Sequence, residues 1–305
     1  MKIEELKDII FKNVQNTNEE FIRLFHGRGS YYDAYEYLLL DSMNKILFLS
    51  LYKEEKEEKQ IIDLVEELYH AKNYECFIVQ RRYLNKSPSM IVLGELKKEE
   101  FIYELGLKYQ AHFLNNQNMG FFSDMKIGHD YVLNNSKNKT VLNLFAYTCV
   151  FSVCAIKGGA TKVVNIDMSK SALNIGRTNH RLNDLDLKKV KFLPHNILKS
   201  WNAIKKEGPY DLIIIDPPSF QKGSFAVSKD YEKIIKRLNV FAKEECIILS
   251  CLNAPELKSD FIKDLYSSLA PEFSFKERLN IMSTHPCKNE ERALKNLIFV
   301  KKGRT

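Results

Sequence analysis

The sequence IIIDPPSF, from Ile213 to Phe220, places an acidic residue, two prolines and an aromatic ring directly after an apolar run. Proline cannot extend a central strand or a helix interior, so Asp216, Pro217 and Pro218 predict a stiff loop where a buried strand ends. That loop would fix the aspartate in space. The ring of Phe220 would offer a face to a planar group, with stacking worth about 1–3 kcal/mol per base. The segment therefore predicts a catalytic site that acts on a flat acceptor such as an extruded nucleobase.

A second carboxylate, Asp167, ends the apolar run KVVNID, roughly 20 residues after Asn143. Carboxylates at this offset bind the ribose hydroxyls of adenosine cofactors. Asp167 or Ser169 could instead cap the helix that is expected to begin near Lys170. The two roles are compatible if each residue takes one of them, and we predict that Asp167 binds ribose.

The run that ends at Thr148, NLFAYT, contains no G-x-G-x-x-G motif. A pyrophosphate needs backbone amides exposed by glycine at a helix N-terminus, whereas Phe145 and Tyr147 are bulky. The segment therefore disfavours NAD and FAD and suits an adenosine cofactor without phosphates, such as S-adenosylmethionine. Asn143 and Thr148 are candidates for hydrogen bonds to its amino-acid end, and Phe145 would serve equally well in core packing.

Asn196 follows the apolar run VKFLPH and lies next to His195. Its amide could bond the adenine amino group, or Asn196 could cap the helix expected over ILKSWNAI, and the sequence leaves both roles open. We interpret His195 as an ordinary loop histidine.

These side chains all follow apolar runs that alternate with helical segments from Lys139 onward. The alternation predicts an α/β fold with a doubly wound parallel sheet, whose strands are buried on both faces. Ligands of such sheets bind outside the carboxyl ends of the strands, so the side chains should meet at one edge. One long helix is expected over DYEKIIKRLNVFAKE, and FSFKERLNIM with LKNLIFV predicts a closing antiparallel pair.

The N-terminal part predicts a smaller α/β domain over residues 1–95, with strands at ILFLSLY, CFIVQRRYL and MIVLGEL. A second domain, with a leading β-hairpin, then covers residues 96–305. Within the first domain, His26-Gly27-Arg28-Gly29 predicts a flexible loop that carries a cation, or else an ordinary turn. We regard RNA docking as a plausible role of this domain.

The 305 residues carry a net charge of +7, with a pI near 8.9 and a hydrophobic fraction of 45%. This composition suits a globular protein and permits a nucleic-acid partner without requiring one. The six cysteines include no C-x-x-C pair, so we predict reduced thiols and no metal site. The start of the chain does not resemble a signal peptide, and no apolar run approaches the roughly 20 residues of a membrane span. We expect a soluble, cytoplasmic protein, and a homodimer stays open.

Four segments resemble class I S-adenosylmethionine-dependent methyltransferases, in particular the bacterial 23S ribosomal RNA large-subunit enzymes of the cytosine-C5 and guanine-N7 types. They are QNMGFFSDMK (Gln117 to Lys126), VLNLFAYT, VVNIDMS and IIIDPPSF, and FHGRG resembles a segment of the same group. With their spacing, the four segments cover about the last two thirds of the chain. The resemblance implies a Rossmann-like, seven-stranded sheet and S-adenosylmethionine as the cofactor.

The resemblance also implies roles for single residues. A hairpin at GFFSDMK would close over the cofactor, with Phe121, Asp124 and Lys126 at its methionine end. Asp216 would lie at the methyl-transfer centre as well as near the cofactor. The other implied cofactor contacts are Asn143, Phe145, Tyr147, Thr148, Asp167, Met168, Ser169 and Asn196. Relatives usually have arginine in place of Lys126, whose ammonium lacks the bidentate fork, and glycine in place of Cys149.

The target base depends on Cys251, which ends the apolar run IILSC. Methylation of cytosine at C5 needs a nucleophile at C6, and a thiolate serves. Cys251 resembles the cysteine of the cytosine-C5 enzymes, but LNAPEL follows it where those enzymes have a small Ser-Gly pair, and it could be a buried structural thiol. Guanine N7 or an exocyclic nitrogen needs only positioning. We favour a nitrogen target.

The leading hypothesis is therefore methyl transfer to a base of RNA, with 23S ribosomal RNA as the expected substrate. A methyltransferase acting on a protein side-chain nitrogen or a small molecule is the nearest alternative, because the Asp-Pro-Pro-aromatic loop suits planar amides as well as bases. A cofactor-binding RNA module without activity is a third hypothesis. The missing glycine motif argues against a dehydrogenase.

Overall fold

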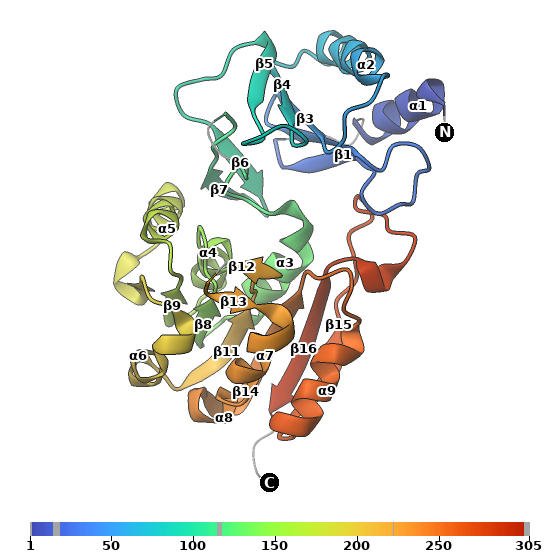
Figure 1. The fold of residues 1–305 in the computed structure, drawn as a ribbon. Helices are drawn as coiled ribbons and strands as arrows, with labels where there is room; N and C mark the ends of the chain where they lie inside the picture. Colours follow the sequence, from blue (N-terminus) through green and yellow to red (C-terminus); the bar gives the residue numbers. More distant parts are fainter. Residues whose placement is uncertain (1, 15–18, 115–117, 222, 302–305) are drawn as a thin grey trace. The chain divides into compact units, whose positions relative to one another are not determined.

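The computed structural model describes residues 2–14, 19–114, 118–221 and 223–301 (Figure 1). Gln117, the first residue of the segment QNMGFFSDMK, lies outside these ranges. Contacts divide the chain into two compact units, Met1–Asp124 with Met282–Lys288 and Met125–Ile281 with Asn289–Thr305. The boundary after Asp124 comes later in the chain than the predicted division after residue 95.

The first unit contains a five-stranded sheet in the order β1-β2-β3-β4-β5. Its strands are β1 (Ile22–His26), β2 (Leu38–Met43), β3 (Ile46–Leu51), β4 (Cys76–Arg81) and β5 (Ser89–Gly94). β3 and β4 are parallel because α2 (Glu58–Ala71) crosses between them, and the other neighbours are antiparallel. The strands expected at ILFLSLY, CFIVQRRYL and MIVLGEL are β3, β4 and β5, whereas β1 and β2 were not expected.

Both faces of this sheet are covered, which explains its nearly continuous apolar runs. One face packs against apolar side chains of α1 (Ile3–Val14) and α2. On the other face, the ring of Phe48 lies 5.9 Å from that of Phe113, in the chain that follows a hairpin of β6 (Phe101–Glu104) and β7 (Leu107–Gln110).

The second unit contains a seven-stranded sheet in the order β10-β9-β8-β11-β14-β16-β15. Its strands are β8 (Thr140–Leu144), β9 (Lys162–Ile166), β10 (Val190–Leu193), β11 (Tyr210–Ile215), β14 (Ala242–Leu252), β15 (Phe273–Arg278) and β16 (Lys295–Lys301). β16 lies between β14 and β15 and runs in the opposite direction to the other six strands of this sheet. If these seven strands are numbered 1 to 7 along the chain, their order in the sheet is 3-2-1-4-5-7-6. The predicted doubly wound sheet and its closing antiparallel pair are confirmed.

Helices cover both faces of this sheet (Figure 1). One layer contains α3 (Lys126–Asn135), α4 (Val150–Lys157) and α5 (Lys170–Leu182), with α4 against β8 and β9. The other layer contains α6 (Trp201–Glu207), α7 (Val227–Ile235), α8 (Leu238–Phe241) and α9 (Ser259–Leu269), which share one apolar core with the strands. No helix among the described residues is long and apolar enough to cross a bilayer.

The single long helix expected over DYEKIIKRLNVFAKE is wrong, because the segment divides into α7 and α8 and then enters β14. Leu238 and Phe241 are buried in the core, and Ala242 already pairs with Tyr210 of β11. Lys243 is held to the same strand by an ion pair with Asp211 at 2.8 Å. Strand pairing therefore outweighs the helical spacing of apolar residues in this part of the sequence.

Candidate active site

Three neighbouring strands end in the same row of the second sheet. Ile166 of β9 pairs with Leu144 of β8, and Leu144 pairs with Ile215 of β11. The chain continues from these residues into Asp167, Phe145 and Asp216. Because neighbouring strands lie about 4.8 Å apart, the two aspartates leave the sheet roughly 10 Å from each other, with Phe145 between them.

The carboxylate of Asp167 connects two loops at this edge. Its Oδ2 accepts a hydrogen bond from the backbone N–H of Tyr147 at 2.9 Å, and its Oδ1 accepts one from the backbone N–H of Ser169 at 2.8 Å. The hydroxyl of Ser169 caps α5 by accepting from the N–H of Ala172 at 3.1 Å. Of the two residues considered for that cap, Ser169 takes the role, and Asp167 keeps its place at the strand end.

The loop after β8 lacks glycine, and three of its larger residues adopt strained backbone conformations instead. Phe145, Tyr147 and Cys149 have positive φ angles of 59°, 45° and 63°, a conformation that costs about 1–3 kcal/mol for a residue other than glycine. The strain is held by hydrogen bonds from Ala146 N to Ile166 O at 3.0 Å and from Cys149 N to Ala146 O at 2.7 Å. The left-handed φ at Cys149 is a conformation that glycine adopts most readily.

The side chain of Cys149 has room because Gly176 of α5 faces it. A Cβ atom placed on Gly176 would lie 2.5 Å from Cys149 Sγ and 2.8 Å from Cys149 Cβ. The thiol is fully buried, and this burial raises its pKa well above the usual range. The two positions are therefore complementary in size.

We expect Gly176→Ala to destabilise the protein by about 2 kcal/mol, because it overpacks this contact. In a Cys149→Gly background the same change should cost less than about 0.5 kcal/mol, since the methyl group then occupies the vacated space. Urea unfolding of the four proteins in this cycle measures the coupling. Equal costs in both backgrounds would contradict the size complementarity.

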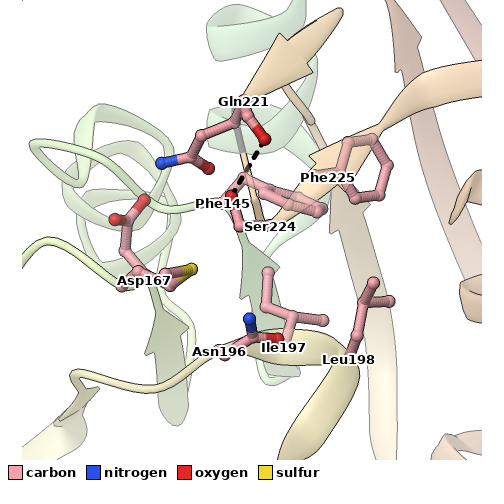
Figure 2. A pocket seen from close by; sticks show the side chains of 9 residues that line it. Phe145, Asp167, Asn196, Ile197, Leu198, Gln221, Ser224 and Phe225 are labelled. Atoms are coloured by element: carbon pink, nitrogen blue, oxygen red, sulfur yellow. Dashed lines mark hydrogen bonds between the residues drawn. The ribbon is translucent and has the colours of Figure 1, made fainter.

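A pocket opens beside Asp167 (Figure 2). It is lined by Phe145, Asp167, Met168, Asn196, Ile197, Leu198, Gln221, Ser224 and Phe225. In Figure 2, Gln221 and Ser224 lie across the pocket from Asn196 and Ile197. Among the described residues, the lining is mainly apolar and contains one carboxylate. It therefore suits an adenosine, which has a flat base and a ribose diol.

The structure brings four of the predicted cofactor residues to this pocket, namely Phe145, Asp167, Met168 and Asn196. Among the lining residues not predicted, Ile197 and Leu198 follow Asn196 directly. Gln221, Ser224 and Phe225 belong to a small hairpin of β12 (Phe220–Gln221) and β13 (Phe225–Ala226). Its turn could have been found from Gly223, which has a φ of 76°.

Asn143 lies in a buried polar network on the sheet face that α4 and α5 cover. Its Nδ2 donates to Asn165 Oδ1 at 2.9 Å, Asn165 Nδ2 donates to Ser152 Oγ at 2.9 Å, and Ser152 Oγ lies 3.0 Å from His180 Nε2. Burial lowers the pKa of His180. The Oδ1 atom of Asn143 has no hydrogen-bond partner among the described residues. The amide nitrogen is thus committed to the sheet, and a cofactor role for Asn143 stays a prediction.

The other predicted cofactor residues lie outside the pocket lining. Thr148 is buried, and its carbonyl accepts from Asn179 Nδ2 at 2.9 Å. Tyr147 contributes its backbone N–H to Asp167. The hairpin expected at GFFSDMK is wrong, because Ser123–Met125 form a 3-10 helix and Lys126 begins α3. Phe121 and Asp124 belong to the first unit, and the roles of these residues at the cofactor stay predictions.

The Asp-Pro-Pro loop is anchored at Ser219, the residue that follows it. Pro217 is buried and Pro218 is exposed. The hydroxyl of Ser219 donates to the carbonyl of Asn253, and the carbonyl of Ser219 accepts from Val227 N at 3.1 Å. Phe220 follows with 70% of its surface exposed. The ring is therefore available to a partner, on a loop with little freedom to move.

Beneath this loop, the buried hydroxyl of Tyr231 lies 3.4 Å from Ile215 O and 3.2 Å from Cys251 O, and donates toward both. It joins the carboxyl ends of β11 and β14. Burial raises the pKa of Tyr231, so the group stays a donor. The thiol-bearing residue Cys251 is fully buried, with 0% of its surface exposed, and does not line the pocket.

The strand order, the carboxylate at the second strand end and the mainly apolar pocket beside it define the class of nucleoside-cofactor methyltransferases with a Rossmann-like sheet. The chain belongs to the S-adenosylmethionine-dependent methyltransferase family, whose model matches residues 22–300. This confirms the predicted family, enzyme class and cofactor.

Two relatives and one solved structure show what the chain is similar to. Ribosomal RNA large subunit methyltransferase I of Aeromonas hydrophila is 33% identical over 168 residues, which are 52% of this chain and 42% of that protein. Ribosomal RNA large subunit methyltransferase K/L of a Shewanella species is 36% identical over 154 residues, 48% of this chain and 22% of that protein. This chain therefore matches less than half the length of each.

The solved structure, SMU.776 complexed with SAH, has a TM-score of 0.85 at 23% identity and covers 97% of this chain and 79% of that chain. At this identity the likeness shows a shared fold.

Proposed function

We propose that the protein transfers a methyl group from S-adenosylmethionine to a base nitrogen of RNA, with large-subunit ribosomal RNA as the substrate. The observation that carries the proposal is the edge at which Asp216 and the exposed ring of Phe220 follow the strand next to Phe145 and Asp167. This edge offers a nucleoside pocket on one side and a stacking face on the other. The names of the relatives supply the expectation that the RNA is ribosomal.

S-adenosylmethionine, when bound, supplies an electrophilic methyl group. Asp167 would hold the ribose hydroxyls, and Asn196 would accept or donate at the edge of the adenine. Phe220 would stack on the acceptor base. Asp216 would hold the base by accepting a hydrogen bond from its amino group, and its negative charge would stabilise the positive charge that develops on the attacking ring. The proline-stiffened loop would keep these two groups in place.

Cys251 gives the strongest argument for nitrogen over cytosine C5. A nucleophilic thiolate must reach the base and must be accessible. Cys251 is fully buried on β14, and its carbonyl is held by Tyr231. We therefore expect Cys251→Ala to keep methyl transfer within about threefold of the wild-type rate. A loss of 100-fold or more, as expected for a missing covalent nucleophile, would assign cytosine C5 instead.

The alternative acceptors are a protein side-chain nitrogen and a small molecule. An RNA enzyme should bind RNA with a strong salt dependence, because bound phosphates release counterions, whereas the alternatives need not. A non-catalytic module would bind cofactor and RNA without turnover. A ribosomal substrate would also put the protein in the cytoplasm.

Isothermal calorimetry with S-adenosylhomocysteine tests the cofactor half of the proposal, with binding expected in the micromolar range. Transfer of labelled methyl to ribosomal RNA tests the substrate half. Absence of heat would refute the first, and label found only in protein or small molecules would refute the second.

A further inference from the structure

In the first unit, three strands that run in the same direction end at one edge of the sheet. β1 and β3 are each antiparallel to β2, and β3 is parallel to β4. Their last residues are His26, Leu51 and Arg81. Leu51 pairs with Arg81 directly, while β2 joins the other two through the pairs Leu39 with His26 and Leu38 with Leu51. The residues that follow these ends must therefore lie close together.

Those following residues form a stack of planar groups. The guanidinium carbon of Arg28 lies 4.1 Å from the centre of the Tyr52 ring, and that of Arg82 lies 5.0 Å from the same centre. Arg28 is exposed, and Tyr52 and Arg82 are half-buried. The exposed residue Lys288 joins them, since its backbone N–H donates to Gly29 O at 2.9 Å. We call Arg28, Tyr52, Arg82 and Lys288 the arginine–tyrosine rim.

The glycines beside Arg28 are packed tightly. A Cβ atom on Gly27 would lie 1.7 Å from Tyr35 O, and one on Gly29 would lie 1.9 Å from Pro286 O. The flexible loop expected from the sequence is therefore fixed at both glycines. Arg28 is presented from a rigid base, which limits the entropy that it loses when it binds a partner.

The positive charge at this edge comes from the cations of the rim itself. Behind it, Arg23 pairs with the buried carboxylate of Asp41 at 2.7 Å. Burial, together with the charges of Arg23 and Arg28, lowers the pKa of His26 to about 3. Tyr31, three residues after Arg28, has 59% of its surface exposed and offers a further ring. Cations combined with exposed planar groups are the surface chemistry of single-stranded nucleic-acid binding.

We propose that the arginine–tyrosine rim binds an unpaired segment of the RNA substrate, with Arg28, Arg82 and Lys288 on phosphates and the planar stack against bases. This inference rests on the proposed RNA substrate and extends it to a docking surface on the first unit. An acidic protein surface would satisfy the charges but would leave the stacked planes without a use.

The probe is a fluorescein-labelled, mixed-sequence, single-stranded RNA, and its binding to the full chain is measured by anisotropy over a range of salt. We expect the double change Arg28→Ala with Arg82→Ala to weaken binding at least tenfold. The slope of log K against log salt should fall by about 0.7 for each arginine. Conversion of both arginines to lysine should keep the slope but still weaken binding, because the planar faces are lost.

Lys98→Ala is the matched control. Lys98 is an exposed cation of the same unit, but it follows Gly94, which pairs with Cys76 at the opposite end of β4 from Arg81. The Lys98→Ala variant should bind RNA with wild-type affinity. All variants should bind S-adenosylhomocysteine with wild-type affinity.

Wild-type RNA affinity in both double variants would overturn the rim, even if methyl transfer to RNA persists and the proposed function stands. Polyglutamate serves as a second probe, which stands for an acidic protein surface. Double variants that lose polyglutamate binding but keep RNA binding would overturn the proposal in favour of an acidic protein partner. If the alanine variant fails to fold, by circular dichroism, the lysine variant decides alone. Weaker RNA binding by the lysine variant than by the wild type would support the proposal, and equal binding would contradict it.

Discussion

Asp216→Ala is expected to lower the rate of methyl transfer at least about 100-fold while leaving the fold and the affinity for S-adenosylhomocysteine within a few-fold of the wild type. The residue directly follows Ile215 at the end of β11, in the row shared with Leu144 and Ile166. It does not line the nucleoside pocket, so its loss should affect the acceptor more than the cofactor. Single-turnover transfer to ribosomal RNA, with calorimetry on the same preparation, separates the two effects.

Asp184→Asn is the control for removing a carboxylate. Asp184 is exposed and has a φ of 54°, a conformation that asparagine tolerates well, and it does not line the pocket. It should transfer methyl groups at the wild-type rate. A fully active Asp216→Ala variant would remove Asp216 from the methyl-transfer centre.

Asp167→Ala should have the second large effect, which falls on the cofactor. Loss of charged hydrogen bonds to the ribose should cost about 2–3 kcal/mol, or roughly 30- to 150-fold in the Kd for S-adenosylhomocysteine. The same change leaves the N–H groups of Tyr147 and Ser169 without their acceptor, so we also expect a loss of about 1–3 kcal/mol in stability. Calorimetry and urea unfolding measure the two losses.

Asp186→Ala separates these effects, because Asp186 also accepts a loop hydrogen bond, from Lys188 N at 2.9 Å, but lies outside the pocket. It should lower stability and keep cofactor affinity. An Asp167→Ala variant that is destabilised to the same degree, yet binds S-adenosylhomocysteine like the wild type, would show that Asp167 only organises its loops.

The sequence predicted the second unit well because its strands are buried on both faces and appear as continuous apolar runs. The position of Asp167 and Asp216 followed from a general property of parallel sheets, that the carboxyl ends of the strands meet at one edge. The strands β1 and β2 were not expected. The segment that contains β1, FIRLFH, includes the polar residues Arg23 and His26, and the Arg23 charge is compensated by Asp41, whose contact is visible only in the fold.

The rest of the pocket was not predictable from local pattern. Gln221 and Phe225 belong to two-residue strands, which are too short to show a period, and Ser224 lies in the turn between them. Their place in the pocket depends on how the hairpin packs, as in the edge-on contact of the Phe225 and Phe145 rings at 4.8 Å. Asn143 is polar and was therefore predicted to bind the cofactor, but its side-chain nitrogen donates a hydrogen bond to Asn165 within the sheet.

The most direct test of the whole account is methyl transfer from labelled S-adenosylmethionine to ribosomal RNA purified from cells that lack this protein, followed by mass mapping of the labelled nucleoside. We predict incorporation at a ring or exocyclic nitrogen of one base in the large-subunit RNA. RNA that stays unlabelled in the presence of cofactor-bound, folded protein would contradict the account.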